Sequence, residues 1–219
     1  MLKIYLSVLI LVCSYNIHAQ NKKSLLVSVN DEEILNKMDL NIYVPQGFNI
    51  VPNSHFECFE NNPTLNKAFS CLNNKLISKT GECVMFIPLH RIFNSEDSIF
   101  LNKISPRDRS FNPNQVHANN LRNQIITLTE VKENWDSYLY HIGSNEAKEG
   151  FNADSVMYFH MELSGNLTYA NKFDNLISLM IQKKDRGFVN IIVLFTKESG
   201  INPRKLLDSL KSNIYYSKE

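Results

Sequence analysis

The chain has 219 residues, of which 43% are hydrophobic and 21% charged, and its formal net charge at pH 7 is +1. This balance is typical of a folded globular protein and argues against a disordered one. The length favours a single domain that buries enough apolar surface to fold without cross-links. The near-neutral charge argues against nucleic acid as a partner, because phosphate binding needs a basic excess or a basic stripe.

The first segment, residues 1–19, has the layout of a secretory signal peptide. Lys3 precedes a short apolar run that ends at Cys13, and Ala19 is a small residue at the expected cleavage site. The residue before Cys13 is large, which argues against lipoprotein processing. No later segment reaches the roughly 18 apolar residues that a membrane helix needs. We therefore expect a periplasmic or secreted domain over residues 20–219, with no membrane span after cleavage.

The first half of the expected domain alternates short strand patterns with turns. Alternating apolar and polar side chains indicate strands, and clusters of Pro, Gly and Asn indicate the turns between them. In chain order, the expected elements are a strand and turn at 40–51, a short strand at 55–59, a helix opened by Pro63, two strands joined by a turn at 75–89 and a long charged loop at 94–112.

Two helices are predicted in the middle of the chain. Asn112-Pro113 offers a cap followed by proline at the first helical position. Ser144 is predicted to cap a second, shorter helix that ends at Gly150. The apolar residues that recur at helical spacing in the first helix are Ala118, Leu121, Ile125 and Leu128.

A strand is predicted over residues 155–163, where side chains alternate between two faces. One face carries Met157, Phe159, Met161 and Leu163. The other carries Val156, Tyr158, His160 and Glu162.

The strongest pattern is an apolar hairpin over residues 175–195. Its turn is Lys184-Asp185-Arg186-Gly187, in which Gly187 is free to adopt a positive φ. The return strand is apolar on both faces, which is typical of a central strand covered on each side. Asn202-Pro203 begins a last helix, and residues 214–216 are an expected edge strand. The apolar stripe of that helix is predicted to consist of Leu206, Leu207, Leu210 and Ile214.

The order of these elements is strands, helix, strands, helix, joined by hairpins and not by parallel crossovers. It predicts an α+β fold, a mostly antiparallel sheet flanked by helices in a single-domain sandwich.

Three cysteines follow the predicted signal peptide: Cys58, Cys71 and Cys83. An odd number in an exported protein permits one disulfide and one leftover thiol, and three buried free thiols are an equal alternative. His55 is near Cys58 in sequence, but a structural thiol or disulfide is favoured over a catalytic pair.

The chain contains no motif of phosphate-binding loops, dinucleotide-binding folds, zinc-dependent hydrolases or serine hydrolases. We therefore assign no catalytic, cofactor-binding or metal-binding residue and expect no cofactor. The best remaining pair is His160 and Glu162, which leave the same strand face and which His90 and His141 would have to join in space. A strand position on the solvent face or on a helix-facing seam is the favoured interpretation, because metal sites need three or four converging ligands.

Aromatic residues indicate a contact surface, because Trp and Tyr are frequent interface residues. Ordinary semi-buried packing is the alternative for any one of them. The residues are Trp135, Tyr138, Tyr140, Tyr215 and Tyr216.

Two stretches, EAKEGFNADSVMYFHMEL and LMIQKKDRGFVNIIVLFTKESGINPRKLLDSLKSNIYY, resemble a group of small secreted proteins of Gram-negative gut-type bacteria. The resemblance covers about the last third of the chain. It implies a periplasmic immunity protein, which binds and neutralises an exported antibacterial toxin. The arrangement of strand, hairpin and helix is also similar to the PsbP/Mog1-like α/β sandwich, and neither resemblance transfers a catalytic residue.

The sequence therefore predicts a non-enzymatic protein-binding protein, an immunity-type inhibitor that occludes a toxin. The expected contact elements are the loop at 94–112, the turn residues Lys184, Asp185 and Arg186, and the aromatic group around Trp135. The alternatives are a hydrolase or metal-dependent enzyme using His160 and Glu162, and a small-ligand binding module.

Overall fold

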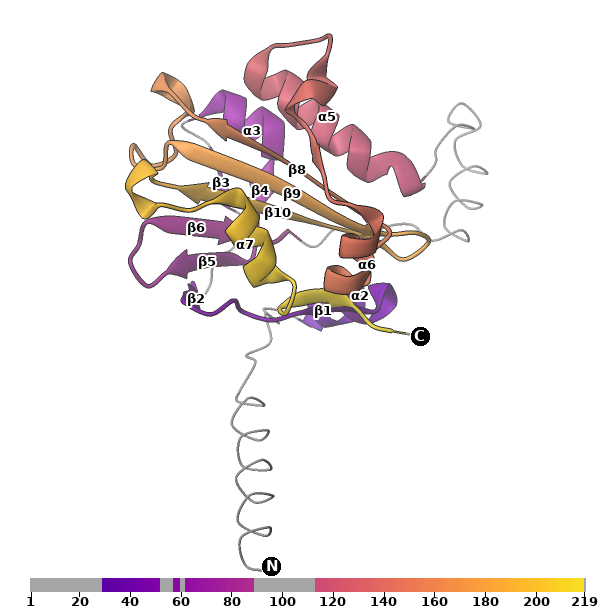
Figure 1. Ribbon diagram of the computed structural model, residues 1–219. Helices are drawn as coiled ribbons and strands as arrows, with labels where there is room; N and C mark the ends of the chain where they lie inside the picture. Colours follow the sequence, from indigo (N-terminus) through magenta and orange to yellow (C-terminus); the bar gives the residue numbers. More distant parts are fainter. Residues whose placement is uncertain (1–28, 52–56, 60–61, 89–112, 219) are drawn as a thin grey trace, which may run out of the picture.

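A central antiparallel sheet organises the computed structural model, which describes residues 29–51, 57–59, 62–88 and 113–218 (Figure 1). The predicted signal peptide and the predicted loop at 94–112 lie outside these ranges. Helices cover both faces of the sheet, so the expected α+β single-domain sandwich is confirmed. Within the described residues the sheet has seven strands, in the spatial order β2 (Phe48–Ile50), β5 (Lys75–Ser78), β6 (Cys83–Phe86), β10 (Gly187–Phe195), β9 (Asn175–Lys183), β8 (Ser155–Glu162) and β7 (Tyr140–His141).

The predicted apolar hairpin forms the middle of the sheet. β9 and β10 pair from Gly187 opposite Lys183 to Phe195 opposite Asn175. Every residue of β10 is buried, which confirms the prediction of a central strand covered on both sides. The turn places Gly187 at a φ of 135°, a conformation that side chains with a Cβ rarely adopt. Along β10 the side chains alternate between the two cores, Val189, Ile191, Val193 and Phe195 in one and Phe188, Ile192 and Leu194 in the other.

One face of the sheet is covered by α3 (Pro63–Phe69) and α5 (Val116–Thr129). α3 begins as predicted, with the Asn62 side chain accepting a hydrogen bond of 2.9 Å from the Leu65 amide. The start predicted for α5, at Asn112-Pro113, is wrong by three residues. Pro113 opens a 3-10 turn over Pro113–Gln115, whose tighter winding also suits the fixed φ of proline, and the α-helix starts only at Val116. Leu121, Ile125 and Leu128 are buried as expected, whereas Ala118 is only partly buried.

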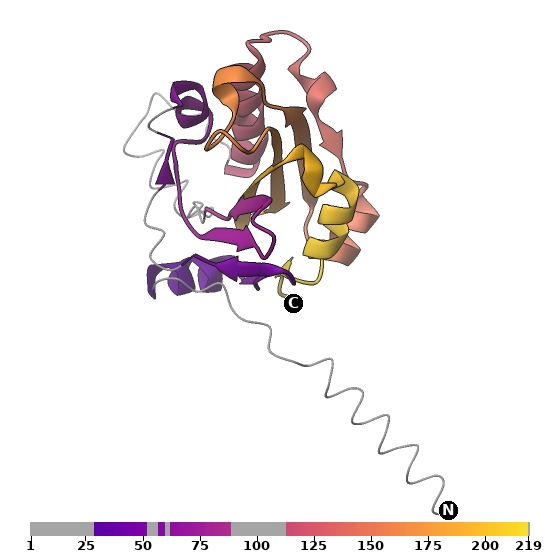
Figure 2. The ribbon, with the colours of Figure 1, turned by 90° about the vertical axis from the view of Figure 1, so that its left-hand side faces the viewer.

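The opposite face is covered by α2 (Val29–Met38), α6 (Ser144–Phe151), α7 (Pro203–Leu210) and a separate strand pair (Figures 1 and 2). The pair joins β1 (Leu40–Ile42) to β11 (Ile214–Tyr216), so residues close to the two ends of the described chain lie side by side.

None of the helices in the described ranges is both long and apolar enough to cross a bilayer. α2 was not predicted from the sequence.

The predicted caps of α6 are wrong. Gly143 holds the cap position, and Ser144 is already the first helical residue, without a side-chain capping bond. Gly150 lies inside the last turn, where a Cβ would come within 2.9 Å of the Lys211 side chain. The helix ends instead at Asn152, which adopts a φ of 49° and donates 3.3 and 2.8 Å hydrogen bonds to the carbonyls of Tyr216 and Ser217. Packing against the C-terminal segment thus sets the end of α6.

The last helix is also shorter than its apolar stripe suggests. α7 begins at Asn202-Pro203 as predicted, and the Asn202 side chain caps it by accepting hydrogen bonds from the amides of Arg204 and Lys205 at 2.9 and 3.3 Å. Leu206, Leu207 and Leu210 are buried. Ile214 is not on the helix but in β11, opposite Ile42. The chain leaves the helix because β1 offers it a strand partner, and the predicted edge strand joins β1 and not the main sheet.

Candidate functional site

The turn between β9 and β10 is an exposed, charged loop whose backbone is held by side chains from two other segments. The Lys184 amide donates a 2.8 Å hydrogen bond to Oδ2 of Asp154. The Asp185 amide donates a 3.0 Å hydrogen bond to Oδ1 of Asn114, and Nδ2 of Asn114 donates to Oδ1 of Asp185 at 3.1 Å. Lys184, Asp185 and Arg186 are all exposed. The turn therefore presents its charges from a fixed backbone.

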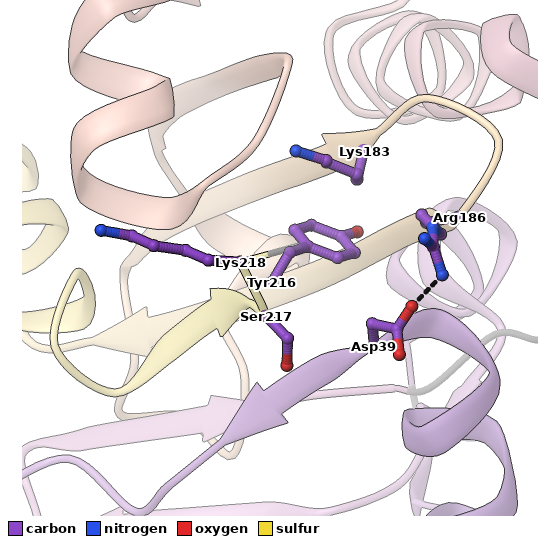
Figure 3. A pocket seen from close by; sticks show the side chains of 6 residues that line it. All are labelled: Asp39, Lys183, Arg186, Tyr216, Ser217 and Lys218. Carbon is purple, nitrogen blue, oxygen red and sulfur yellow. Dashed lines mark hydrogen bonds and ion pairs between the residues drawn. The ribbon is translucent and has the colours of Figure 1, made fainter.

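Arg186 extends from this turn to Asp39, the residue between α2 and β1, and forms an ion pair with it. The pair borders a pocket of about 170 Å³ beside the turn (Figure 3). The pocket combines residues from three parts of the chain. They are Asp39, Lys183, Arg186, Tyr216, Ser217 and Lys218.

Tyr216 lies at the centre of this pocket in Figure 3 and is only 1% exposed. Its hydroxyl donates a 2.8 Å hydrogen bond to the Gly187 carbonyl, which ties β11 to the hairpin. Burial raises the pKa of the Tyr216 hydroxyl, so that it stays protonated. Of the two interpretations of Tyr216, packing is therefore correct and the contact surface is wrong, and its neighbour Tyr215 is half-buried against Tyr43.

The pocket carries more positive than negative charge. Lys183, Arg186 and Lys218 contribute three cations, and Asp39 is the single carboxylate among the lining residues. Lys183 Nζ lies 3.3 Å from the side-chain oxygen of Asn152, a neutral partner. In Figure 3 the Lys218 side chain extends away from Arg186 and Asp39, so the basic groups do not converge on one point of the pocket.

The predicted aromatic group is divided between the two faces of the sheet. Trp135 is half-buried against the core beneath α5, with the Arg122 guanidinium 5.6 Å from its ring centre. Tyr140, on edge strand β7, is 54% exposed and stacks at 5.0 Å on Tyr158, which packs against the other core. Tyr138 is exposed between them in the chain. Trp135 and Tyr140 therefore do not share one face.

His160, on β8, contacts side chains of the two strands beyond it, β9 and β10. Its ring stacks on Phe195 with 5.9 Å between ring centres, and Nε2 lies 3.3 Å from Oδ1 of Asn175. Glu162 is exposed at the end of the same strand. The alternation predicted for this strand is confirmed, because Met157 and Phe159 enter one core while Val156 enters the other.

The histidines that would have to join His160 do not do so within the described residues. His141 lies opposite Met157 in the β7–β8 register and therefore on the other face from His160. His90 lies outside the described residues. No group of three or more His, Cys, Asp or Glu side chains in the described ranges is placed to hold a metal ion.

The cysteines fall into two groups. Cys83 is a buried free thiol in β6, and burial raises its pKa to about 12, so it is a poor nucleophile. Cys58 and Cys71 are directly opposite each other in the pair formed by β3 (Glu57–Cys58) and β4 (Cys71–Leu72).

Sequence reasoning named two of the residues that line the pocket, Arg186 in the turn and Tyr216 in the aromatic group, but did not join them in one site. The others have no local motif, and the cluster of charges at 183–186 was the one signal pointing toward them. The missed residues are Asp39, Lys183, Ser217 and Lys218 in the pocket, with Asn114 and Asp154 as the side chains that hold the turn.

Comparison with known proteins places no relative beside this chain: no family model, curated protein or solved structure matches it. The resemblance to periplasmic immunity proteins and to the PsbP/Mog1-like sandwich therefore stays a prediction.

Proposed function

We propose that the protein is a non-enzymatic binding protein, an immunity-type inhibitor that occludes an exported antibacterial toxin with the β9–β10 turn. The observation that carries this proposal is the fixed geometry of the turn. Asp154 and Asn114 hold the backbone at Lys184 and Asp185, while the side chains of Lys184 and Asp185 remain exposed. A loop with this structure can insert into a partner without being ordered first.

Preorganisation matters because binding normally costs free energy to immobilise the contact residues. That cost is about 0.5–1.5 kcal/mol for each flexible side chain that becomes ordered, with loop ordering added to it. Here the turn backbone is already ordered when the chain folds, so binding does not have to order it. The turn also extends from the two central strands of the sheet, which are buried except at Lys183, and this gives it a rigid base.

The identity of the partner as a toxin is supported by the C-terminal resemblance and by the predicted signal peptide. An alternating set of charges, Lys184, Asp185 and Arg186, provides specificity through complementary charges on the partner. Inhibition would follow from occupation of the partner's active site, so no chemical step by this chain is required.

The test uses the gene next to this one. Its product is co-expressed in the periplasm with the full chain, and growth and direct binding by calorimetry are measured. We expect the chain to restore growth and Lys184→Glu to weaken binding by about tenfold or more, since reversing a contact charge adds repulsion to lost attraction.

Lys197→Glu is the matched control, because it reverses the same charge at an exposed position beyond the other end of β10. At about 3.4 Å per residue, the nine residues of β10 separate the two sites by roughly 30 Å. The proposal is wrong if the chain neither binds nor neutralises the neighbouring product, or if both variants weaken binding equally.

A further inference from the structure

The strand β7 forms one edge of the central sheet, between the 3-10 turn η3 (Trp135–Tyr138) and α6. The backbone is extended beyond the two residues of β7, from Leu139, with φ −87° and ψ 133°, to Gly143, with φ −56° and ψ 143°. Tyr140 and His141 are both exposed. In Figure 2 the segment that leads from α5 to α6 lies along one margin of the molecule. The sheet therefore has an accessible, extended edge of five residues.

The backbone groups of this edge alternate in direction. The Ile142 amide donates a 3.0 Å hydrogen bond to the Val156 carbonyl of β8. Because bonded and non-bonded positions alternate along an antiparallel pair, the even-numbered residues of the edge face β8. The backbone groups that point away from the sheet are those of Leu139, His141 and Gly143.

Only part of this outward set is used within the chain. The Leu139 amide donates a 3.0 Å hydrogen bond to the Asp136 carbonyl, and the Gly143 carbonyl accepts one of 2.9 Å from the Ala147 amide. Four groups remain, and none of them has a partner among the described residues. They are the Leu139 carbonyl, the His141 amide and carbonyl, and the Gly143 amide. Unpaired groups on an exposed edge are a template for pairing with another strand.

The order of these four groups is its own complement about a twofold axis through His141. In an antiparallel pair of two copies, each His141 amide donates to the His141 carbonyl of the other copy. Each Gly143 amide donates to the Leu139 carbonyl of the other copy. All four groups of both copies are then bonded.

We propose that the protein forms a symmetric dimer in which β7 pairs with β7 of a second copy, so that one sheet runs through both. A strand from an unrelated protein would leave its own groups opposite the Leu139 amide and the Gly143 carbonyl without partners. In the second copy those opposing groups are already bonded within its own chain, at Asp136 and Ala147. The inference is independent of the proposed function, because no residue of the β9–β10 turn takes part.

The side chains of the edge suit the same contact. Tyr140 would lie opposite Ile142 of the second copy, as a non-hydrogen-bonded pair with Cα atoms about 4.5 Å apart. Tyr140 is 54% exposed, the more exposed of the two large hydrophobic side chains that the described residues leave at the surface. Ile142 packs against the same core as Tyr158, on which Tyr140 stacks. The twofold axis makes this apolar contact twice.

The elements that flank β7 do not obstruct the pairing, because they lie on opposite faces of the sheet. Trp135 of η3 packs on the core beneath α5, whereas Ala147 and Phe151 of α6 pack in the other core. A twofold axis perpendicular to the sheet keeps each face on its own side, so η3 of one copy passes α6 of the other. Five residues at about 3.4 Å each give a ladder of roughly 17 Å, which is a small interface and predicts a weak dimer.

The experiment is sedimentation velocity of the full chain at increasing concentration. We expect a reversible shift from monomer to dimer with a dissociation constant of about 10–100 µM, since small interfaces bind weakly. Gly143→Pro removes the outward amide and with it two of the four hydrogen bonds, so it should weaken dimerisation about tenfold or more. The φ of −56° already suits proline, and a Cβ at Gly143 meets no atom within 4 Å, so the fold should be unchanged. Gly143→Ala is the matched control, because it adds the Cβ and keeps the amide.

A charge variant tests the same edge. His141→Lys places two lysines opposite each other across the twofold axis and should weaken dimerisation, because like charges directly opposite are destabilising. Asn49→Lys is its control, since Asn49 is exposed in the middle of β2, the other edge strand. Amide hydrogen exchange at low and high protein concentration gives the site, with slower exchange expected at His141 and Gly143 in the dimer.

Three outcomes would overturn the proposal. The first is a chain that stays monomeric over the whole concentration range. The second is an equal effect of Gly143→Pro and Gly143→Ala, or of His141→Lys and Asn49→Lys. The third is a dimer that leaves the exchange of both edge amides unchanged, because it is then built on another surface.

Discussion

The face of the sheet beneath α6 and α7 buries almost only apolar side chains, whereas the face beneath α5 carries polar residues within its core. On the α5 face, Ser178 Oγ lies 2.6 Å from Oε1 of Gln124 and 3.3 Å from Oδ1 of Asn190, and all three residues are buried. On the other face, β9 and β10 contribute Ile177, Leu179, Ile181, Val189, Ile191, Val193 and Phe195.

The difference shows two ways of holding a helix on the same sheet. Apolar contacts are not directional and depend mainly on volume and shape. A buried hydrogen-bonded group loses free energy when its partner is displaced, so the Ser178, Gln124 and Asn190 cluster favours one position of α5 on the sheet. Each buried residue on the α5 face should therefore contribute less free energy of folding than one on the apolar face. The position of α5 on the sheet should be fixed more narrowly than the positions of α6 and α7.

The largest effect is expected on the apolar face. Ile191→Ala removes a side chain that is 0% exposed, and we expect it to lower the free energy of unfolding by about 2–5 kcal/mol. Urea denaturation of the purified chain measures this as a fall in the midpoint concentration. Lys184→Ala, at an exposed position in the turn, should change stability by less than about 0.5 kcal/mol. A cost below 1 kcal/mol for Ile191→Ala would contradict the buried position.

A disulfide at the edge of the α5 face should have the next largest effect. Cys58 and Cys71 are opposite each other in an antiparallel pair, where Cα atoms are about 4.5–5.5 Å apart, within the range that a disulfide spans. We expect this pair to form under oxidising conditions and its reduction to lower stability by about 3 kcal/mol, the value for a loop of this length.

Mass spectrometry of the unreduced protein, digested with a protease, identifies the linked peptides, and Cys83→Ser is the control that should leave the link unchanged. Cys83 is buried and free, so it should react with an alkylating reagent only after unfolding. Alkylation of both Cys58 and Cys71 in the denatured, unreduced protein would refute the pairing.

A change in the polar cluster beneath α5 should lower the free energy of unfolding by less, and through a lost hydrogen bond instead of a cavity. Ser178→Ala leaves the buried oxygens of Gln124 and Asn190 without the hydroxyl, and we expect a loss of about 1–3 kcal/mol. Adding Gln124→Leu should cost less than the sum of the two single changes, because the second change removes one orphaned oxygen. Strict additivity in this double-mutant cycle would show that the cluster does not act as a unit.

The smallest effect is a pH dependence that arises from His117 on α5. Burial lowers the pKa of His117 below its ordinary value of 6.5, and the backbone of Asn114 offsets this in part. At pH values above 6.5 the residue is neutral in both states, and as the pH falls below 6.5 the unfolded chain takes up a proton that the folded chain resists. Stability should therefore decrease from pH 7 to lower pH, by at most about 1.4 kcal/mol per pH unit for this residue.

His117→Gln should remove this part of the pH dependence, measured as the unfolding free energy from urea titrations between pH 7 and pH 5. His141→Gln, at an exposed position on β7, is the control and should leave the slope unchanged. Equal slopes for the wild type and His117→Gln would show that His117 does not titrate differently in the folded state.

Much of the fold could be predicted because its elements have local causes. The alternation on β8, the two apolar faces of β10 and the helix starts at Pro63 and at Asn202-Pro203 are patterns within a few residues of each other. The errors occurred where a distant segment competed with the local pattern. Ile214 continues the helical spacing but pairs with β1, and Ser144 looks like a cap but follows the actual cap at Gly143.

The candidate site was less predictable than the fold. The charges of the turn were visible in the sequence, but the side chains that hold it, Asn114 and Asp154, lie 71 and 30 residues away. Asp39 is 147 residues from Arg186. Contacts at such separations have no periodic signal, so Arg186 and Tyr216 were named for other reasons and not as parts of one pocket.

The amino-acid sequence by itself determined the fold class, most of the strands and helices, the central hairpin and the exposed charged turn, because hydrophobic periodicity and turn residues act within a few positions along the chain. The tertiary structure alone decided that Asp39, Lys183 and Lys218 meet beside that turn, that the aromatic residues divide between two faces and that a polar cluster sits beneath α5. Those features depend on how the strand pair β1–β11 and the helices pack against the sheet, and packing joins residues irrespective of their distance in sequence.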